Sequence, residues 1–237
     1  MAHIHLEDGA LSPIWVVFWW AVAAALIGFA LLSLRRERVP TRRMTVAAMC
    51  AAVGIAVFLV TIPVFGGIHL NLTPLIGILA GPALGSLATL IINLFSAAVG
   101  HGGWGVIGVN TVVNLIEVLV GYYAYRALRT RARVSRFSSG FSAAALALTL
   151  SAVIVVIIIA VAGVQDSHLD EEETAHNLWV IAAVNIGVGV VEGVITGYVV
   201  SFIGRIKPDL LEETERGAGD SSGKETPEGT AEQDGGG

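Results

Sequence analysis

The sequence predicts an all-α polytopic membrane protein of about seven transmembrane helices, two of them short. Three observations predict this fold class: 54% of the 237 residues are hydrophobic, only 14% are charged, and the apolar residues gather in long runs. An ordinary soluble domain has roughly a quarter charged residues. Most of the chain is therefore expected to lie in lipid, and the protein is expected to be a multi-pass protein of the cell membrane.

The apolar runs define the predicted membrane segments. At roughly 1.5 Å per residue, about 20 apolar residues cross ~30 Å of hydrocarbon. Runs near this length lie at residues 13–34, 44–64, 104–128, 141–163 and 178–203. A further apolar stretch, residues 69–99, is interrupted by Gly81-Pro82, which predicts two helices, the first of them short, meeting at a sharp bend.

Positive charges predict the topology. Of the 14 Lys and Arg residues, five lie at residues 35–43 and five at 126–136, and the others follow the last apolar run. The positive-inside rule places these segments in the cytoplasm. Because residues 43 and 126 are both inside only when an even number of crossings separates them, the stretch 69–99 must cross twice. The prediction is seven segments, with the amino terminus outside and the carboxyl terminus inside.

This topology places every histidine on the outer side: His3, His5, His69, His101, His168 and His176. The positions of the histidines were not used to derive the topology, so their clustering indicates one common site. The alternative is that they are surface histidines without a binding role, which also occur in loops. An acidic loop at residues 166–173 either raises the local cation concentration or is merely solvated.

The two ends of the chain carry different predictions. The first residues bear histidines and acids rather than a basic leader, so we expect no signal peptide and a mature protein that begins at residue 1 or 2. Residues 208–237 hold nine acidic residues and little apolar content. They predict a disordered acidic cytoplasmic tail behind a transmembrane domain of residues 1–207. Residues 219–224 lack the spacing of a P-loop, so no nucleotide site is expected.

The amino terminus offers nitrogen ligands. It reads Met1-Ala2-His3-Ile4-His5. An unprotonated terminal amine, the next amide and an imidazole can bind one metal in a plane, an arrangement that selects nickel(II) or copper(II). Removal of Met1 would leave Ala2-His3 with three such ligands and one open corner, whereas a retained Met1 would let Met1-Ala2-His3 fill all four corners. A simply solvated terminus is the alternative.

Polar residues inside the apolar runs form two stripes. Asn110, Asn114 and Glu117 share one helix face, and so do Asn185, Gly189, Glu192 and Thr196. Because such stripes are costly against lipid, we expect both to face the protein interior. They are either hydrogen-bonded packing between helices or a polar lining behind a binding site or partner contact. The single Cys50 lies in an apolar run, which excludes a disulfide framework and a cysteine metal cluster.

Several short motifs stand in a recognisable order. They are His-Leu-Glu-Asp-Gly-Ala-Leu-Ser-Pro at 5–13, Gly-Gly-Ile-His at 66–69, Gly-Pro at 81–82, Gly-His-Gly-Gly at 100–103, Gly-Val-Asn at 108–110 and Glu-Gly-Val-Ile-Thr at 192–196. Over roughly residues 3–204 the chain therefore resembles the CbiM/NikM family, the substrate-binding (S) membrane subunits of energy-coupling factor cobalt and nickel transporters.

The resemblance implies a metal site on the outer face. In the family, the terminal amine, the adjacent histidine with its amide and a loop histidine hold the metal. Carried across, these roles fall to the mature terminus at Met1 or Ala2, to His3 or His5, and to His69. The family's turn aligns on His5 while the terminal position favours His3, so we expect His3 to chelate after loss of Met1, with His5 as an added or alternative ligand. His101 is either a further ligand near the His69 loop or a surface histidine.

The resemblance also implies the partners and the cargo. The substrate would be Ni2+ or Co2+, with no permanent cofactor and no catalytic residues. Expected partners are a transmembrane coupling (T) subunit, ATPase subunits, a small accessory membrane subunit and the lipid bilayer, with no nucleic acid. Two rival functions are an S component for a vitamin, which would need a roomy aromatic pocket, and an intramembrane metalloenzyme. The chain has no H-E-x-x-H motif for the latter.

Overall fold

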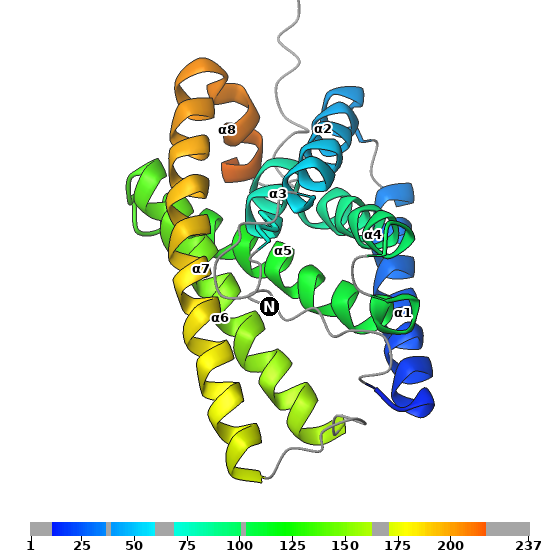
Figure 1. Ribbon diagram of the computed structural model, residues 1–237. Coiled ribbons are helices and arrows are strands. Elements are labelled where there is room, and N and C mark those ends of the chain that lie inside the picture. Colours follow the sequence, from blue (N-terminus) through cyan, green and yellow to red (C-terminus); the bar gives the residue numbers. More distant parts are fainter. Residues whose placement is uncertain (1–10, 37–38, 60–68, 101–102, 163–170, 217–237) are drawn as a thin grey trace, which may run out of the picture.

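The described part of the protein is entirely helical. The computed structural model describes residues 11–36, 39–59, 69–100, 103–162 and 171–216. Five helices in this part are long and apolar enough to cross a membrane (Figure 1). They are α1 (Pro13–Arg36), α2 (Thr41–Phe58), α5 (Ile107–Thr130, after a 3-10 turn at Trp104–Val106), α6 (Arg136–Ala162) and α7 (Glu171–Ile206). The predicted polytopic helical fold is confirmed, and its long spans fall on the predicted apolar runs.

The predicted bend at Gly81-Pro82 is also confirmed. α3 (Thr73–Ala80) ends before it and α4 (Pro82–Ala98) begins with it. Gly81 has φ 81° and ψ 175°, a backbone region that is essentially restricted to glycine. Pro82 then starts the new helix at a position where its missing N–H costs nothing. With eight residues, α3 is only ~12 Å long and cannot cross the hydrocarbon by itself.

α5 is the central helix of the fold. In its most apolar window 67% of the residues are buried against protein, compared with 17% in α1. It contacts α1, α3, α4, α6 and α8. The approach of α3 to α5 is close, because a Cβ added at Gly77 would lie 2.3 Å from the carbonyl oxygen of Val118. A Cβ at Gly121 would likewise lie 2.8 Å from Pro74 Cα, so both helices need glycine at the contact.

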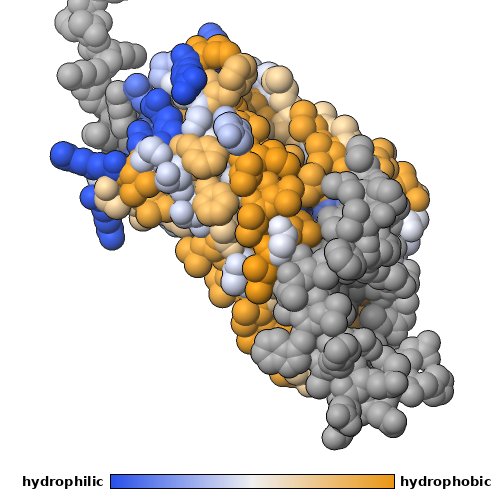
Figure 2. Space-filling model, turned by 60° about the vertical axis from the view of Figure 1, so that its left-hand side comes forward, coloured by the Kyte–Doolittle hydropathy of each residue, from blue (hydrophilic) through white to orange (hydrophobic). Residues whose placement is uncertain are grey.

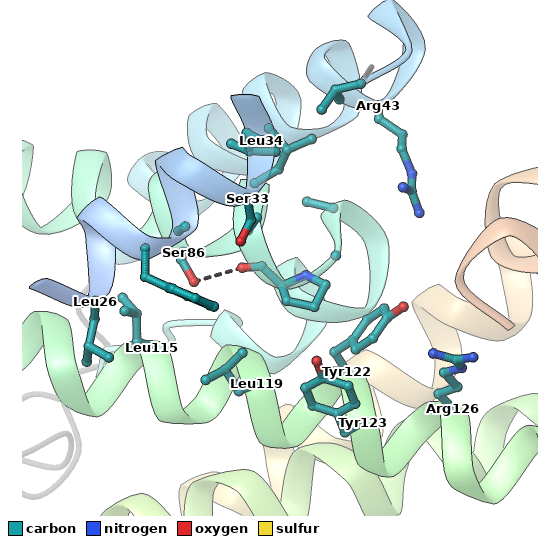
Figure 3. Close-up of a pocket in the computed structure, with 18 residues that line it drawn as sticks. Leu26, Ser33, Leu34, Arg43, Ser86, Leu115, Leu119, Tyr122, Tyr123 and Arg126 are labelled. Atoms are coloured by element: carbon teal, nitrogen blue, oxygen red, sulfur yellow. Dashed lines mark hydrogen bonds between the residues drawn. The ribbon is translucent and has the colours of Figure 1, made fainter. Parts of the chain in front are cut away.

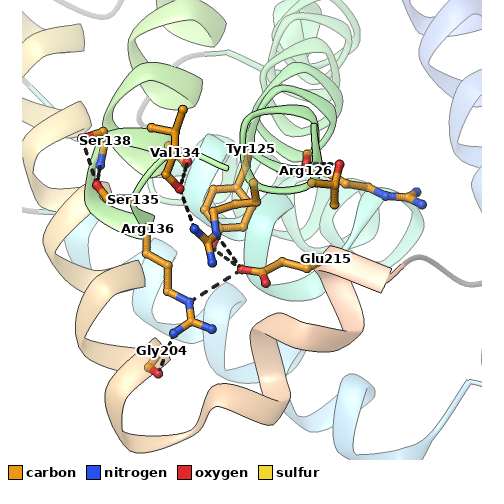
Figure 4. A network of polar contacts seen from close by, with 11 residues as sticks. Tyr125, Arg126, Val134, Ser135, Arg136, Ser138, Gly204 and Glu215 are labelled. Atoms are coloured by element: carbon orange, nitrogen blue, oxygen red, sulfur yellow. Dashed lines mark hydrogen bonds and ion pairs between the residues drawn. The ribbon is translucent and has the colours of Figure 1, made fainter. Parts of the chain in front are cut away.

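Contacts between distant segments bring the arginine-rich stretches to one end of the molecule. Arg42 Nη2, at the start of α2, lies 2.5 Å from Asp209 Oδ2, at the start of α8 (Pro208–Arg216). Arg129 Nε donates to Glu215 Oε1 over 2.9 Å, and Arg136 Nε lies 3.6 Å from the same oxygen (Figure 4). The segments predicted to share the cytoplasm therefore share one end of the fold. Which side of the membrane this end faces stays a prediction.

The structure differs from the predicted tail at its beginning. Residues 208–216, expected to be disordered, form α8 and pack against α3 and α7 (Figure 1). Leu211 is fully buried, and the hydroxyl of Thr214 donates to the carbonyl oxygen of Ile78 over 3.0 Å. The helix forms because its apolar side has a partner surface while its acids pair with arginines. Residues 217–237 lie outside the described residues.

The surface agrees with a lipid environment. Large apolar side chains are exposed along the long helices, among them Phe29 at 72%, Val161 at 66% and Phe202 at 63%. In Figure 2 the hydrophilic residues gather at one end of the described surface, and hydrophobic residues cover the part beside it. Water would disfavour so much exposed apolar area, whereas hydrocarbon does not.

Candidate functional site

A short non-helical segment leads from His69 into α3. It runs through the buried residues Asn71 and Leu72 to Thr73, the first residue of the helix. Leu72 adopts the left-handed conformation, with φ 53° and ψ 21°. A non-glycine residue in this region is uncommon and must be stabilised by its surroundings. The segment is therefore a constrained turn inside the protein.

Glu192 of α7 supplies part of that stabilisation. Its Oε1 accepts the backbone N–H of Asn71 over 2.8 Å, and its Oε2 accepts the N–H of Leu72 over 3.1 Å. Glu192 is completely buried. N–H groups at the start of a helix have no partner within the helix, and the leucine that caps α3 has no polar side chain to offer them. A carboxylate from another helix satisfies these donors with strong, charge-assisted hydrogen bonds.

Glu117 of α5 binds the next residue of the same turn. The hydroxyl of Thr73 donates to Glu117 Oε2, and both side chains are buried. The two buried glutamates of the membrane region thus converge on three consecutive residues that follow His69. The polar stripes were expected to be either hydrogen-bonded packing between helices or a polar lining behind a binding site. These contacts show hydrogen-bonded packing, and the same hydrogen bonds hold the segment that follows His69.

A second polar chain connects α4 to α5. Asn114 Nδ2 donates to Asn93 Oδ1 over 2.9 Å, and Asn93 Nδ2 donates to the hydroxyl of Thr111 over 3.1 Å. The predicted inward orientation of Asn110, Asn114 and Glu117 is confirmed, since all three are buried. Glu192 and Thr196 are buried as well, while the side chain of Asn185 lies outside the described residues.

The imidazole of His69 is held on two sides. Its Nδ1 lies 3.0 Å from the carbonyl oxygen of Phe58, the last residue of α2. Its ring stacks on the Phe58 ring, with centroids 5.3 Å apart and an interplanar angle of 23°. Because a carbonyl oxygen only accepts, this hydrogen bond requires the proton on Nδ1 and places the lone pair of the neutral ring on Nε2. That tautomer is suited to bind a metal through Nε2.

The other candidate ligands fall outside the described residues: Met1, Ala2, His3, His5 and His101. Within the part of the chain that the structure describes, no three His, Cys, Asp or Glu side chains are close enough together to hold a metal ion. Leu11 lies in one hydrophobic cluster with Val106, the last residue of the 3-10 turn, and with Val109 in the first turn of α5.

Sequence reasoning did not identify Asn71, Thr73, Asn93 and Thr111 as part of the polar interior. One signal for the first two is present: Pro74 occupies the start of a helix, which marks the residues before it as a helix start. An asparagine within the apolar run of α4 is the signal for Asn93, because a polar amide facing lipid would be costly.

Comparison with known proteins identifies the family. The CbiM family model, described as the cobalt uptake substrate-specific transmembrane region, matches residues 5–210. A chain of Methanocorpusculum labreanum named as a cobalt transport protein is 32% identical over 216 residues, which cover 89% of this chain and 93% of that protein. A chain of Archaeoglobus fulgidus named as a fused nickel transport protein is 28% identical over 214 residues, covering 89% and 68%.

The fold has a counterpart among solved structures. The crystal structure of a transition metal transporter superposes with a TM-score of 0.71 at 20% identity, and the match covers 90% of this chain and 99% of that chain. At this identity the similarity shows the fold alone. The family model and the similar relatives together span nearly all of the described helices, and the chain therefore belongs to the CbiM family of cobalt-uptake transmembrane proteins, a transport family and not an enzyme family.

Proposed function

We propose that this chain is the substrate-binding membrane subunit of an energy-coupling factor importer for nickel or cobalt ions. Membership of a cobalt-uptake family and a relative named for nickel transport support this cargo. In this proposal the metal is captured at the outer face by a few nitrogen ligands and released inward after a conformational change.

The orientation of His69 carries the proposal. Its Nδ1 donates to the Phe58 carbonyl, which fixes the ring and places the lone pair of the neutral tautomer on Nε2. Glu192 accepts a hydrogen bond from the backbone N–H of Asn71, two residues after His69, and so holds the backbone of the same segment. A ligand that is positioned before the metal arrives loses less conformational entropy on binding, and it therefore binds more tightly.

The remaining ligands in the proposal come from the amino terminus. Loss of Met1 would give Ala2 a free amine, and His3 would add its amide and imidazole. His69 would then complete a tetragonal set, with His5 or His101 as an alternative or additional ligand. Nitrogen ligands in this geometry favour nickel(II) over zinc(II). One similar relative is named for cobalt transport and another for nickel transport, so the proposal includes both metals as cargo.

Energy for transport would come from other subunits. The carboxyl-terminal residues 219–224 lack the P-loop pattern, and ATP hydrolysis is assigned here to separate ATPase subunits. The proposed assembly contains a transmembrane coupling subunit that joins those ATPases to this chain, and a small accessory membrane subunit. Co-expression of the full chain with the products of the neighbouring genes would test this assembly, and the measurement is which subunits co-purify with the chain.

A metal titration of the purified full chain tests the site. His69→Ala should lower the affinity for Ni2+ and Co2+ by about tenfold or more, because it removes a metal-bound imidazole. His168→Ala is the matched control, since it removes a histidine to which the proposal gives no ligand role. The affinity of the native chain should rise between about pH 6.5 and 8, as the amine and imidazoles lose the protons that compete with the metal.

Blocking the terminus is the stricter test. An uncleaved extension before Met1 removes the terminal amine while every side chain stays in place, so the affinity should collapse. Undiminished binding of both metals by the extended protein would refute the terminal chelate. Full retention of metal by His69→Ala would remove His69 from the site.

A further inference from the structure

A cavity of about 440 Å³ lies between α1, α2, the α3–α4 bend and α5 (Figure 3). It is separate from the His69 segment. Its walls come from the last turns of α1, the beginning of α2, the residues around Gly81-Pro82 and the part of α5 from Leu115 to Arg126. The rim includes exposed aromatic side chains, Phe29 at 72% and Tyr123 at 56%, so the cavity lies at the surface that faces the membrane.

The cavity is divided into an apolar part and a positively charged part. Leu26, Leu115 and Leu119 line the apolar part. In Figure 3 Arg43 of α2 and Arg126 of α5 both lie on the right-hand side of the cavity, Arg43 above and Arg126 below, and Leu26 and Leu115 lie on the left-hand side. Among the described residues that line the cavity, these two arginines are the only charged ones. The lining therefore fits a molecule with an anionic head and an apolar body.

The length of the cavity fits one leaflet of a bilayer. Leu115 and Arg126 lie eleven positions apart on α5, which is ~16 Å along the helix axis, about half of a hydrocarbon core of ~30 Å. The charged part belongs to the arginine-rich end, where α1 ends with Arg35 and Arg36. Tyrosines at the same level are typical of a membrane interface.

We propose that this cavity binds an anionic phospholipid, with the phosphate between Arg43 and Arg126 and one acyl chain along Leu26, Leu115 and Leu119. Each guanidinium presents five N–H donors, so it can bind a phosphate oxygen in addition to its contacts within the protein. Basic pockets between membrane helices at the cytoplasmic side recognise anionic head groups through the same chemistry. The bound lipid would bridge α1, α2, α5 and the bend after α3.

Native mass spectrometry of the full chain tests this site, with phosphatidylglycerol and phosphatidylcholine as probes. The native chain should retain phosphatidylglycerol in preference to phosphatidylcholine. Arg43→Gln with Arg126→Gln should weaken phosphatidylglycerol binding by about tenfold or more, because two charge-assisted contacts are lost. The control is Arg131→Gln with Arg133→Gln, which removes the same charge from exposed positions outside the cavity and should bind as the native chain does.

Leu119→Trp distinguishes a lipid from a free anion. It fills the apolar part and leaves both arginines in place, so it should weaken phosphatidylglycerol binding, while inorganic phosphate should not displace the lipid from the native chain. Equal retention of the two lipids would overturn the proposal, and so would unchanged phosphatidylglycerol binding in both the double arginine variant and Leu119→Trp. Displacement by phosphate would assign the arginines to a free anion. Crosslinking of position 119 to another subunit in the assembled transporter, with no lipid retained, would assign the cavity to a protein helix and equally refute a lipid site.

Discussion

Glu192→Gln tests whether the buried glutamate of α7 holds the His69 segment. The carboxylate uses both oxygens, one for the N–H of Asn71 and one for the N–H of Leu72. Glutamine has the same shape but only one acceptor oxygen, and its NH2 group is a donor. One of the two backbone donors would therefore face another donor in a place that water does not reach.

The magnitude follows from the two losses. A hydrogen bond to a charged group contributes about 1.5–3 kcal/mol, and a buried donor left without a partner costs about 1–3 kcal/mol. Because Glu192 is 0% exposed, solvent cannot compensate for either loss. We expect a destabilisation of about 2.5–6 kcal/mol. For a chain of this size that corresponds to a decrease in Tm on the order of 5–25 °C.

The assay compares thermal unfolding of the purified full chain in one detergent with hydrogen exchange of the amides at residues 69–73. Glu192→Gln should lower the Tm, speed exchange at these amides and weaken metal binding, because the turn after His69 loosens. Thr196→Val is a matched control one turn further along α7. Its hydroxyl is buried and has no hydrogen-bond partner in the described part of the chain, so its removal should change the stability by less than about 1 kcal/mol.

Two results would refute the reasoning. If Glu192→Gln unfolds at the same temperature as Thr196→Val, the two hydrogen bonds do not contribute to stability. If exchange at residues 69–73 is unchanged while the Tm falls, the glutamate stabilises the helix packing and not the turn that carries His69.

Three further predictions concern the bend, α8 and the topology. Gly81→Ala should lower the free energy of unfolding by about 1–3 kcal/mol through backbone strain alone, because the added Cβ meets no atom within 4 Å. Gly28→Ala in α1 is the control and should be neutral or stabilising. Equal Tm values for the two variants would contradict this prediction. Thr214→Val should lower the free energy of unfolding by about 0.5–1.5 kcal/mol, because α8 loses its hydrogen bond to α3, and faster proteolysis of the carboxyl terminus should accompany it. A cysteine at residues 166–173 should react with a membrane-impermeant thiol reagent outside intact cells and one at residues 129–136 should not; the reverse labelling would overturn the predicted sidedness.

Local backbone chemistry made part of the fold predictable from sequence. Gly81 and Pro82 determine the backbone conformation locally, so these two adjacent residues are enough to predict the bend between α3 and α4. The burial of Glu117 and Glu192 is predictable for a similar reason, because helical periodicity gives the face and the cost of a charge in lipid gives its direction.

The partners of these glutamates were not predictable. Glu117 and Thr73 are 44 positions apart, and Glu192 and Asn71 are 121 positions apart. Such pairs form only when the packing of α3, α5 and α7 is known, and no spacing rule connects them. α8 was missed for another reason. The composition of residues 208–237 averages over the whole segment and hides the short stretch around Leu211, which becomes buried only because α3 and the arginines of α5 and α6 provide a surface for it.

The short helix α3 physically connects the His69 segment to the arginine-rich end. Glu192 binds the two residues that precede α3, Glu117 binds its first residue, and its last turn accepts a hydrogen bond from Thr214 of α8. Gly77 lets it lie against the backbone of α5, so it cannot tilt without opening that contact. A helix of about two turns is too short to bend appreciably. Any displacement of the turn after His69 therefore either breaks the glutamate hydrogen bonds or moves α3 as a unit, and in the second case the contact between α3 and α8 has to change as well.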